Sequence, residues 1–398
     1  MNAGTALELL GAEDGGFAVA DWARVAALVA PGSPAGEGVD AADWAAVVAA
    51  VSAAQAPNTV RAYVSDWQRF ERFCGARGFA ALPVDPAHLA VYLAVTAATR
   101  TESGQRAYAL ATLRRWVAAI NRRHAEAGHP HPGSALLIRR TITGIEAEYA
   151  AEGARPPRRA APLVLEDMLA IITHLHTSPG TWHARVPARR DAALLLLGYA
   201  GAFRRSELAD LRVSDVRRRR HGLDVRLRQS KTSRTAPLVR PLPHGSSPLT
   251  CPPCAHLRWL RVLAAHQDGG RPAIIRLLRE PDPAVEHVCG GRWPVFEDRE
   301  VPLFRWVRGT GLLAHTHLSG DAINLMVRRR AAEAGLVADI GVYGGHSARA
   351  GHVTEGFRRG LDANTIMRGT GHKNPRTLEV YRREADPLAG NSVTRIGL

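Results

Sequence analysis

A proline-rich basic segment near the middle of the chain constrains the fold more than any other feature. GARPPRRAAP, from Gly153 to Pro162, contains two adjacent prolines that prevent a helix, and its arginines favour contact with water. It separates two long regions of regular hydrophobic spacing. A chain of 398 residues, 46% of them hydrophobic, is long enough for two or three folded domains. The segment therefore predicts a linker at residues 153–162 with a domain on each side.

The region before this linker is predicted to be helical. Apolar residues recur there at steps of three and four, and Asp85–Pro86 is a cap followed by a proline at the first helical position. We expect a compact, basic α-helical domain at residues 52–152. Its expected helices are Asn58–Cys74, Asp85–Thr99, Gln105–Ala127 and Ser134–Tyr149.

The region after the linker, residues 163–398, is predicted to be mainly helical with a small β-sheet. Leu223, Val225 and Leu227 alternate with polar residues before the turn KTSR, and a second strand-like run follows, which is typical of a β-hairpin with Lys231 at its turn. A long irregular insertion is expected at residues 248–300, and RRRR at 217–220 is of low complexity. The expected helices are Leu165–Leu175, Ala188–Ala200, Ser206–Val216 (with Ser206 as cap), Ser319–Gly335, Ser347–Gly360, Ala363–Gly369 and Asn374–Glu384.

Charge is distributed unevenly along the chain. Residues 1–50 hold seven acidic residues and Arg24 alone, so they carry −6 of the total +15 and leave +21 on the remainder. Such a remainder favours a polyanionic partner, usually nucleic acid, although a basic surface that serves only solubility is the alternative. Residues 1–51 are expected to be an acidic, alanine-rich appendage with weak helices around Trp22 and Trp44. With no secretion signal and no long apolar run, a cytoplasmic protein without membrane contact is expected.

Six residues in the carboxyl-terminal region suggest phosphodiester chemistry. They are Arg204 in GAFRRSEL, Lys231 at the hairpin turn, His346 and Arg349 in GGHSARAG, and His372 and Tyr381 in GHKNPRTLEVY. Each one alone is more often structural: a capping arginine, a turn lysine, a hydrogen-bonded histidine or a core tyrosine. Without a metal ion, however, phosphodiester cleavage needs a nucleophile, cations for the transition state and an acid for the leaving oxygen. This set supplies all three, so a chance origin is a poor explanation.

With these motifs, residues 58–384 resemble the tyrosine recombinase family, also called phage integrases. The resemblance implies a helical core-binding domain and a mixed α+β catalytic domain that together clamp double-stranded DNA at specific recombination sites. It implies that Arg204, Lys231, His346, Arg349 and His372 surround the phosphate and that Tyr381 attacks it. Neither a metal ion, another cofactor nor ATP would be required. It also implies a homotetramer on DNA in which residues after Tyr381 reach a neighbouring protomer.

The chemistry of these groups is consistent with those roles. A phenol, with a pKa of about 10, must lose its proton during attack, and His346 is a candidate to accept it. Guanidinium groups, as at Arg204 and Arg349, bind two oxygens at once. His372 would hydrogen-bond the phosphate, and Lys231 would protonate the departing 5′-oxygen. The product would be a 3′-phosphotyrosyl bond whose energy permits rejoining.

Two other functions remain open at this stage. A type IB DNA topoisomerase uses a similar set of residues, although the compact GHKNPRTLEVY segment and the linker favour a recombinase. A basic, helical DNA-binding regulator without catalysis would have Tyr381 as a core residue only. Among recombinases, integration, excision and dimer resolution are not distinguished by the sequence.

The cysteines permit two interpretations. Cys251 and Cys254 have the spacing of two zinc ligands, and His287 and Cys289 could complete a site. The two pairs are 33 residues apart, however, and His-x-Cys is an unusual half-site. Free cysteines in a partly buried loop are the favoured interpretation.

Overall fold

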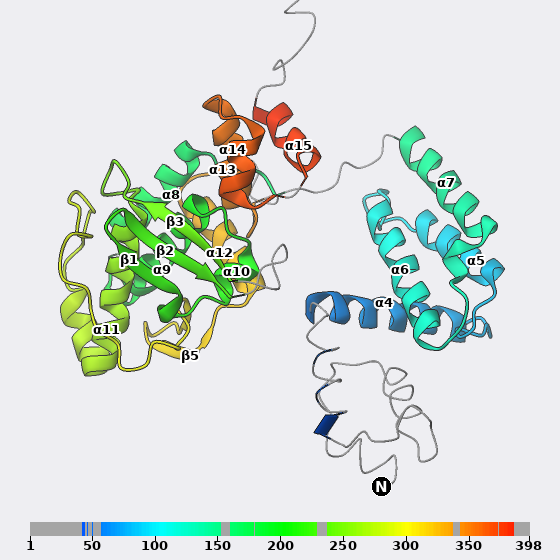
Figure 1. Ribbon diagram of the computed structural model, residues 1–398, viewed down its shortest axis with the longest axis horizontal. Coiled ribbons are helices and arrows are strands. Elements are labelled where there is room, and N and C mark those ends of the chain that lie inside the picture. The colour runs from blue at the N-terminus through cyan, green and yellow to red at the C-terminus, as the bar shows by residue number, and fades with distance from the viewer. Residues whose placement is uncertain are drawn as a thin grey trace, which may run out of the picture. The chain divides into compact units, whose positions relative to one another are not determined.

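The computed structural model describes residues 57–152, 160–178, 180–228, 237–336, 343–372 and 374–385, and the single residues 42, 43, 46 and 50. The chain divides into two compact units, residues 1–158 and 159–398, here called the amino-terminal and carboxyl-terminal units (Figure 1). Most of the expected linker and nearly all of the expected appendage, including Trp22 and Trp44, lie outside the described residues. Among the described helices, none is both long and apolar enough to cross a membrane.

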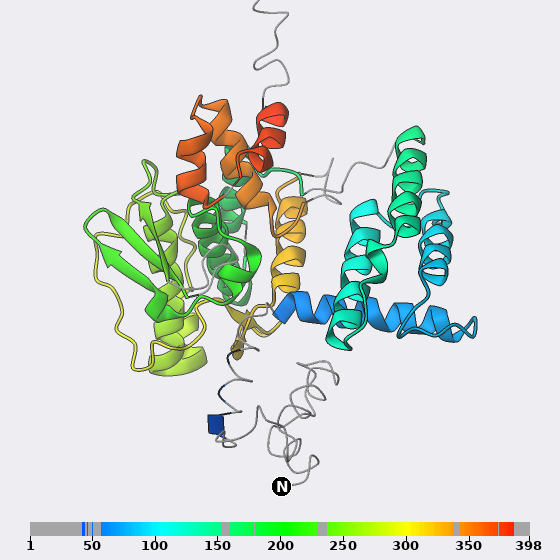
Figure 2. The same cartoon turned by 45° about the vertical axis from the view of Figure 1, so that its right-hand side comes forward.

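The described part of the amino-terminal unit is a four-helix domain (Figure 2). Its core contains the fully buried side chains of Phe70, Tyr92 and Trp116, which come from three helices. The cap predicted at Asp85 is confirmed, because its carboxylate accepts a hydrogen bond from the Ala87 amide at 2.7 Å. The helices are α4 (Pro57–Gly75), α5 (Pro86–Ala98), α6 (Leu110–Glu126) and α7 (Leu136–Ala151), and the 3₁₀ turn η2 (Pro132–Ser134) precedes α7.

The start of α6 differs from the prediction. A helix was expected from Gln105, but α6 begins at Leu110. The chain turns tightly before it, with Gly104 at φ +73° and a β-bridge between Arg100 and Arg106. Glycine tolerates that conformation readily, so the turn interrupts an otherwise helical pattern.

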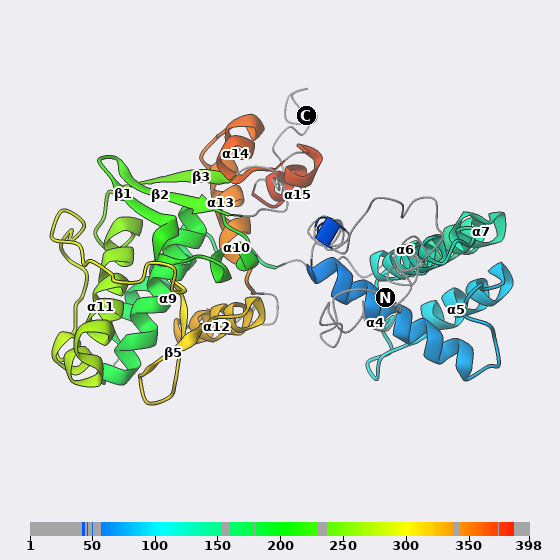
Figure 3. The same ribbon diagram turned by 60° about the horizontal axis from the view of Figure 1, so that its bottom comes forward.

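The carboxyl-terminal unit surrounds one buried helix, α9 (Trp182–Ala200), whose residues from Ala188 to Gly198 are all buried. Helix α11 packs along α9, and the three-stranded antiparallel sheet β1–β2–β3 lies over α11 (Figure 3). The strands are β1 (Val216–Arg219), β2 (Gly222–Leu227), β3 (Leu238–Pro243), β4 (Arg305–Val307) and β5 (Leu313–His317). The helices are α8 (Leu165–Thr177), α9, α10 (Arg205–Ala209), α11 (Pro252–Leu277), α12 (Gly320–Glu333), α13 (Ser347–Arg358), α14 (Ala363–Thr370) and α15 (Arg376–Ala385), and the 3₁₀ turn η3 (Val213–Asp215) precedes β1.

The predicted hairpin is confirmed as the antiparallel pair β2 and β3, in which Leu223 faces Leu242. Its turn, including Lys231, lies outside the described residues. Three arginines of the run at 217–220, Arg217–Arg219, form strand β1 together with Val216 at the edge of the sheet. Only Val216 of this strand is buried, so its arginines face solvent, as is common on edge strands.

The expected irregular insertion is only partly irregular. Helix α11 occupies 26 residues of it and bends at Gly270, whose φ of 56° is not helical, two residues before Pro272. Residues 278–304, all of them described, form neither helix nor strand. The prolines and glycines concealed a helix that is stabilised by packing on α9.

Candidate functional site

Arg204 lies at a tight turn between α9 and α10. A side chain at Gly201 would overlap the ring of Phe203, and Ala202 adopts a left-handed conformation at φ +47°. Such backbone strain costs on the order of 1–3 kcal/mol and is often found at functional sites. Arg204 is the residue that caps α10, so the cap expected at Ser206 is wrong, and Ser206 lies within the helix.

Glu207 fixes the Arg204 side chain. One carboxylate oxygen accepts a hydrogen bond from the Arg204 amide at 2.8 Å, and the other accepts one from Arg204 Nη1 at 2.7 Å. The Glu207 side chain is only 5% exposed, which strengthens the ion pair. Sequence reasoning missed this residue, although a glutamate three residues after a helix cap is a recognised signal.

Arg349 and His372 meet beside this turn. Arg349, on α13, is 7% exposed, and its Nη1 donates to the carbonyl of Ala202. Its Nη2 lies 3.1 Å from Nε2 of His372, which follows α14. Burial, with a smaller effect from Arg204, lowers the pKa of Arg349 to about 10. Arg349 therefore remains a cation at neutral pH, but one for which an anionic neighbour would be favourable.

The contacts of His372 determine its protonation state. Arginine can only donate, so Nε2 of His372 accepts from Arg349. The hydroxyl of Thr370 donates to the Ile366 carbonyl at 2.8 Å, so it accepts from Nδ1–H of His372 at 2.6 Å. Burial, followed by the charges of Arg349 and Arg204, lowers the pKa of His372 to about 4. The imidazole is therefore neutral near pH 7.

His346 caps α13 at the edge of the same group and is exposed. Partial withdrawal from water and the neighbouring cation of Arg205 lower its pKa, which keeps it available as a proton acceptor. Two glycines position it. Gly345 donates its amide to Asn324 Oδ1 at 2.8 Å, and a Cβ at Gly344 would lie 2.3 Å from the same oxygen.

Tyr381 lies on α15, which packs against α13 (Figure 1). Leu378, one turn earlier, is fully buried against Val353 and Ile366 and anchors the helix. The Tyr381 side chain is half-buried at the margin of this cluster and lies close enough to Arg349 to influence its pKa. The structure thus brings Arg204, His346, Arg349, His372 and Tyr381 together, and we call this set the cationic cluster. Lys231 lies outside the described residues.

Arg240 is a further cation beside the cluster that sequence reasoning missed. It is 9% exposed on β3, and its Nη1 donates to the carbonyls of Arg368 and Gly369 at the end of α14. Its charge helps to lower the pKa of both Arg349 and His372. The alternation of β3 could have revealed it in the sequence. Arg240 lies on the same inward face of the strand as Leu238 and Leu242, where an arginine is unusual.

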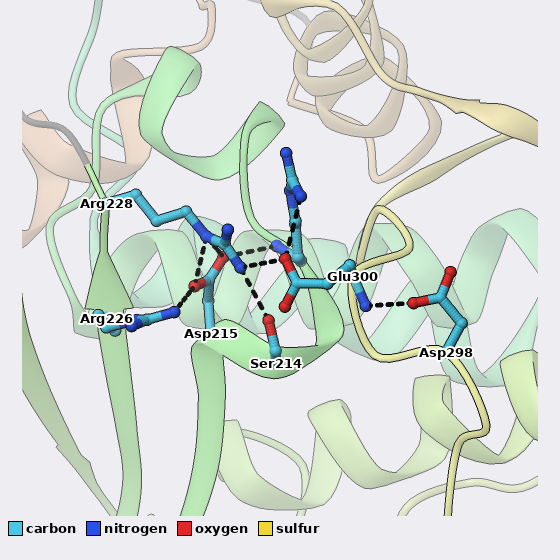
Figure 4. Close-up of polar contacts among 7 residues, drawn as sticks. Ser214, Asp215, Arg226, Arg228, Asp298 and Glu300 are labelled. Atoms are coloured by element: carbon cyan, nitrogen blue, oxygen red, sulfur yellow. Dashed lines mark hydrogen bonds and ion pairs between the residues drawn. The ribbon is translucent and has the colours of Figure 1, made fainter.

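Acidic side chains fix the described base of the hairpin (Figure 4). Asp215, which is 1% exposed, accepts hydrogen bonds from Arg226 and from Arg228 Nε, the latter at 2.8 Å. Glu300 accepts from Arg228 Nη2 at 2.7 Å, so the insertion contacts the residue that directly follows β2. Glu207, Asp215, Arg228 and Glu300 also line one pocket.

The chain is similar in sequence to a curated protein and in fold to solved structures. It is 25% identical over 346 residues to an integrase/recombinase xerD homolog of Selenomonas ruminantium, which covers 86% of each chain. It superposes on the XerH site-specific recombinase, in a post-cleavage complex with palindromic difH substrate, with a TM-score of 0.53, 12% identity and coverage of 98% of this chain and 94% of the other. No protein-family model matches.

These comparisons confirm the predicted resemblance to the tyrosine recombinases. They also confirm the expected fold class, a helical domain followed by a mixed α+β domain. The likeness in fold spans both units of the chain. The roles expected for individual residues remain predictions.

Proposed function

We propose that this chain is a site-specific recombinase that cleaves and rejoins double-stranded DNA through a 3′-phosphotyrosyl bond to Tyr381. One observation supports this most strongly. Arg204, Arg349 and Tyr381 converge from separate segments, and buried Arg349 is held there by a carbonyl and a neutral imidazole. An excess of fixed positive charge in a partly dry site favours a phosphate whose negative charge increases during reaction.

In the proposed reaction, Arg204 and Arg349 bind the nonbridging oxygens of the scissile phosphate. A guanidinium carries five N–H donors, and the described contacts of Arg349 to Ala202 and His372 use two of them. Because Glu207 and the Ala202 carbonyl already hold these side chains in position, little reorganisation is needed when the phosphate binds.

His346 and His372 have different tasks in this scheme. His346 accepts the phenolic proton of Tyr381 as the phosphotyrosyl bond forms, while the 5′-oxygen leaves with a proton from Lys231. A bound phosphate opposes the cationic neighbours of His372 and so raises its pKa. Protonation would convert Nε2 of His372 from an acceptor into a donor to the phosphate.

The proposed partner is DNA that carries a recombination site, bound by a homotetramer. Net charge supports the DNA partner, because +21 of formal charge lies beyond residue 50. The XerH comparison supports it too, since that recombinase was captured with its difH substrate. Residues 386–398, proposed to reach a neighbouring protomer, lie outside the described part of the chain.

The recombinase relative favours this function over a type IB topoisomerase, and the cationic cluster favours it over a regulator without catalysis. The direct test uses a nicked suicide substrate and denaturing gel electrophoresis. Wild type should form a covalent protein–DNA adduct. Tyr381→Phe should bind the same DNA with near-normal affinity and form none.

An adduct in the phenylalanine variant would move the nucleophile to another residue. Tyr343 lies three residues before His346 and is the next candidate, but its side chain is 9% exposed within the hydrophobic core. Tyr343→Phe is therefore a suitable control and should form the adduct as wild type does. Absence of an adduct with wild type on every tested substrate would contradict the proposed function.

A further inference from the structure

Four potential metal ligands meet at one end of α11, away from the residues of the cationic cluster in sequence. Cys251 caps this helix, Cys254 lies in its first turn, and His287 and Cys289 come from the irregular segment that follows it. Their ligand atoms all lie within 4.8 Å of one another. The three cysteines are buried and form no disulfide, whereas His287 is exposed.

The spacing fits a single tetrahedral metal ion. With metal–sulfur bonds of about 2.3 Å and metal–nitrogen bonds of about 2.0 Å, tetrahedral geometry separates a nitrogen ligand from a sulfur ligand by about 3.5 Å. Nδ1 of His287 lies 3.4 Å from Cys254 Sγ and 4.0 Å from Cys289 Sγ. These distances lie on either side of the tetrahedral value, so small side-chain adjustments would suffice.

The surroundings of the four residues are compatible with a bound metal ion. Nδ1 of His244 lies 3.3 Å from the sulfur of Cys289. Cys251 and Cys254 also lie at the amino-terminal end of a helix, where negative charge is favoured. Val288 and Trp293 cover the cluster with apolar surface. Hydrogen bonds to ligand atoms and a dry surrounding are usual around bound metal ions.

We propose that Cys251, Cys254, His287 and Cys289 bind one structural Zn²⁺. Three thiolates and one neutral imidazole complete a four-coordinate site, which leaves no position open for catalysis. Binding would release the protons of whichever thiols are still protonated. Soft sulfur ligands in this geometry favour zinc over magnesium or calcium.

The structure removes the objection raised by the sequence. The 32 residues between Cys254 and His287 consist mainly of α11, which bends at Gly270, and of a segment that returns to its first turn. The return segment therefore brings His287 and Cys289 next to Cys251 and Cys254 at the start of α11. His-x-Cys is sufficient as a half-site because the side chains of both residues reach Cys254.

The proposed metal would hold the irregular segment in place. Trp293 of this segment donates to the Cys289 carbonyl at 3.0 Å, and the Arg218 guanidinium lies 5.4 Å from the centre of its ring. The same segment continues to Glu300, which binds Arg228 at the base of the hairpin. A zinc ion would thus connect α11, the sheet and the strand that leads to Lys231.

Metal content tests the proposal directly. Full-length protein purified from zinc-containing medium without chelators should contain about one zinc per chain by mass spectrometry. Cys254→Ser and Cys289→Ser should each lose most of it. Cys74→Ser is the matched control, since Cys74 is also buried but belongs to the amino-terminal unit, and should retain the full content.

A second measurement does not depend on whether the variants fold. Titration of wild type with an organic mercurial should release zinc in proportion to modified thiols, and cobalt-substituted protein should show the visible absorption of tetrahedral thiolate coordination. Thermal unfolding should move to lower temperature after chelation. Wild type with less than about a tenth of a zinc per chain, or with iron instead, would overturn the proposal.

His244 permits a test of the fourth ligand. Its Nδ1 lies 3.3 Å from Cys289 Sγ, so it is the matched control for His287. His287→Ala should weaken zinc binding and change the cobalt spectrum, whereas His244→Ala should alter both only slightly. The reverse result would contradict the assigned ligand set. Because none of these measurements involves DNA, failure of the zinc site would leave the recombinase function untouched.

Discussion

Arg106 in the amino-terminal unit and Arg349 in the carboxyl-terminal unit are held in opposite ways. In the amino-terminal unit, Arg106 donates to Glu152, whose hydrogen bond raises the pKa of the guanidinium. In the carboxyl-terminal unit, Arg349 contacts a carbonyl and an imidazole, and burial lowers its pKa to about 10. The first arrangement neutralises charge within the fold. The second arrangement buries a cation without neutralising it, so a bound anion would stabilise its charged form.

This difference distinguishes an arginine whose charge is neutralised by a carboxylate of the fold from one whose charge is available to a ligand. Exposed ion pairs contribute little to stability, and water screens them. A cation withdrawn from water but left without a carboxylate is costly to the fold, so it is expected only where a function requires it. Four predictions test this comparison.

The largest effect is expected at Arg349. Arg349→Ala should lower the rate of single-turnover DNA cleavage by about a thousandfold or more, because the charge that develops on the phosphate loses a buried donor. Arg114→Ala, which alters an exposed pair with Glu146 in the amino-terminal unit, is the control and should cleave saturated substrate at nearly the normal rate. Equal cleavage rates for the two variants would contradict the claim that Arg349, unlike Arg114, acts on the phosphate.

Acid should destabilise the carboxyl-terminal unit first. Burial lowers the pKa of His176 to about 4 and that of His256 to about 3, both below their ordinary values. Protonation therefore favours the unfolded chain, so stability is complete above about pH 6.5 and falls as the pH decreases towards 4. For His176 the loss is about 2 kcal/mol by pH 5.

Hydrogen exchange at pH 7 and pH 5, corrected for intrinsic rates and resolved by peptide, measures this difference. In the amino-terminal unit burial also lowers the pKa of His124, so some loss is expected there too. Peptides from α8, α9 and α11 should nevertheless lose more protection than those from α4 to α7. Greater acid sensitivity of the helical domain would reverse the comparison.

A smaller effect is expected at Glu207. Glu207→Gln keeps an oxygen for the Arg204 amide but removes the charge opposite Arg204, so the arginine should be less well oriented. Cleavage should fall about tenfold with little change in DNA affinity. Glu152→Gln, which removes the charge opposite Arg100 and Arg106 in the amino-terminal unit, should leave cleavage within about twofold of wild type. A loss of DNA binding in Glu207→Gln would show that Glu207 supports the fold rather than the orientation of Arg204.

The smallest effect is expected from the exposed pair itself. Arg114→Ala should change the free energy of unfolding by less than about 1 kcal/mol, because both side chains are accessible to water. Chemical denaturation followed by circular dichroism would measure it. A change of several kcal/mol would mean that surface ion pairs of this unit carry stability after all.

Local signals in the sequence predicted much of the fold. Asp85–Pro86 predicted the start of α5 because a cap and a proline act within a single turn, and alternation at Leu223, Val225 and Leu227 predicted β2 because each pleat exposes one face. The cap of α10 was wrong by two residues, since the strained turn at Ala202 places Arg204 first. Helix α11 was missed because its prolines and glycines resemble those of a loop.

The sequence by itself determined which groups are available: a tyrosine, arginines and histidines in an order that resembles the tyrosine recombinases, and cysteines with ligand spacing. Only the tertiary structure decided their environment. It buried Arg349 beside His372, added Glu207 and Arg240, and closed the 33-residue gap between Cys254 and His287 to 3.4 Å. The physical reason is that charge and ligand geometry depend on distance and exclusion of water, and packing between segments remote in the chain sets both.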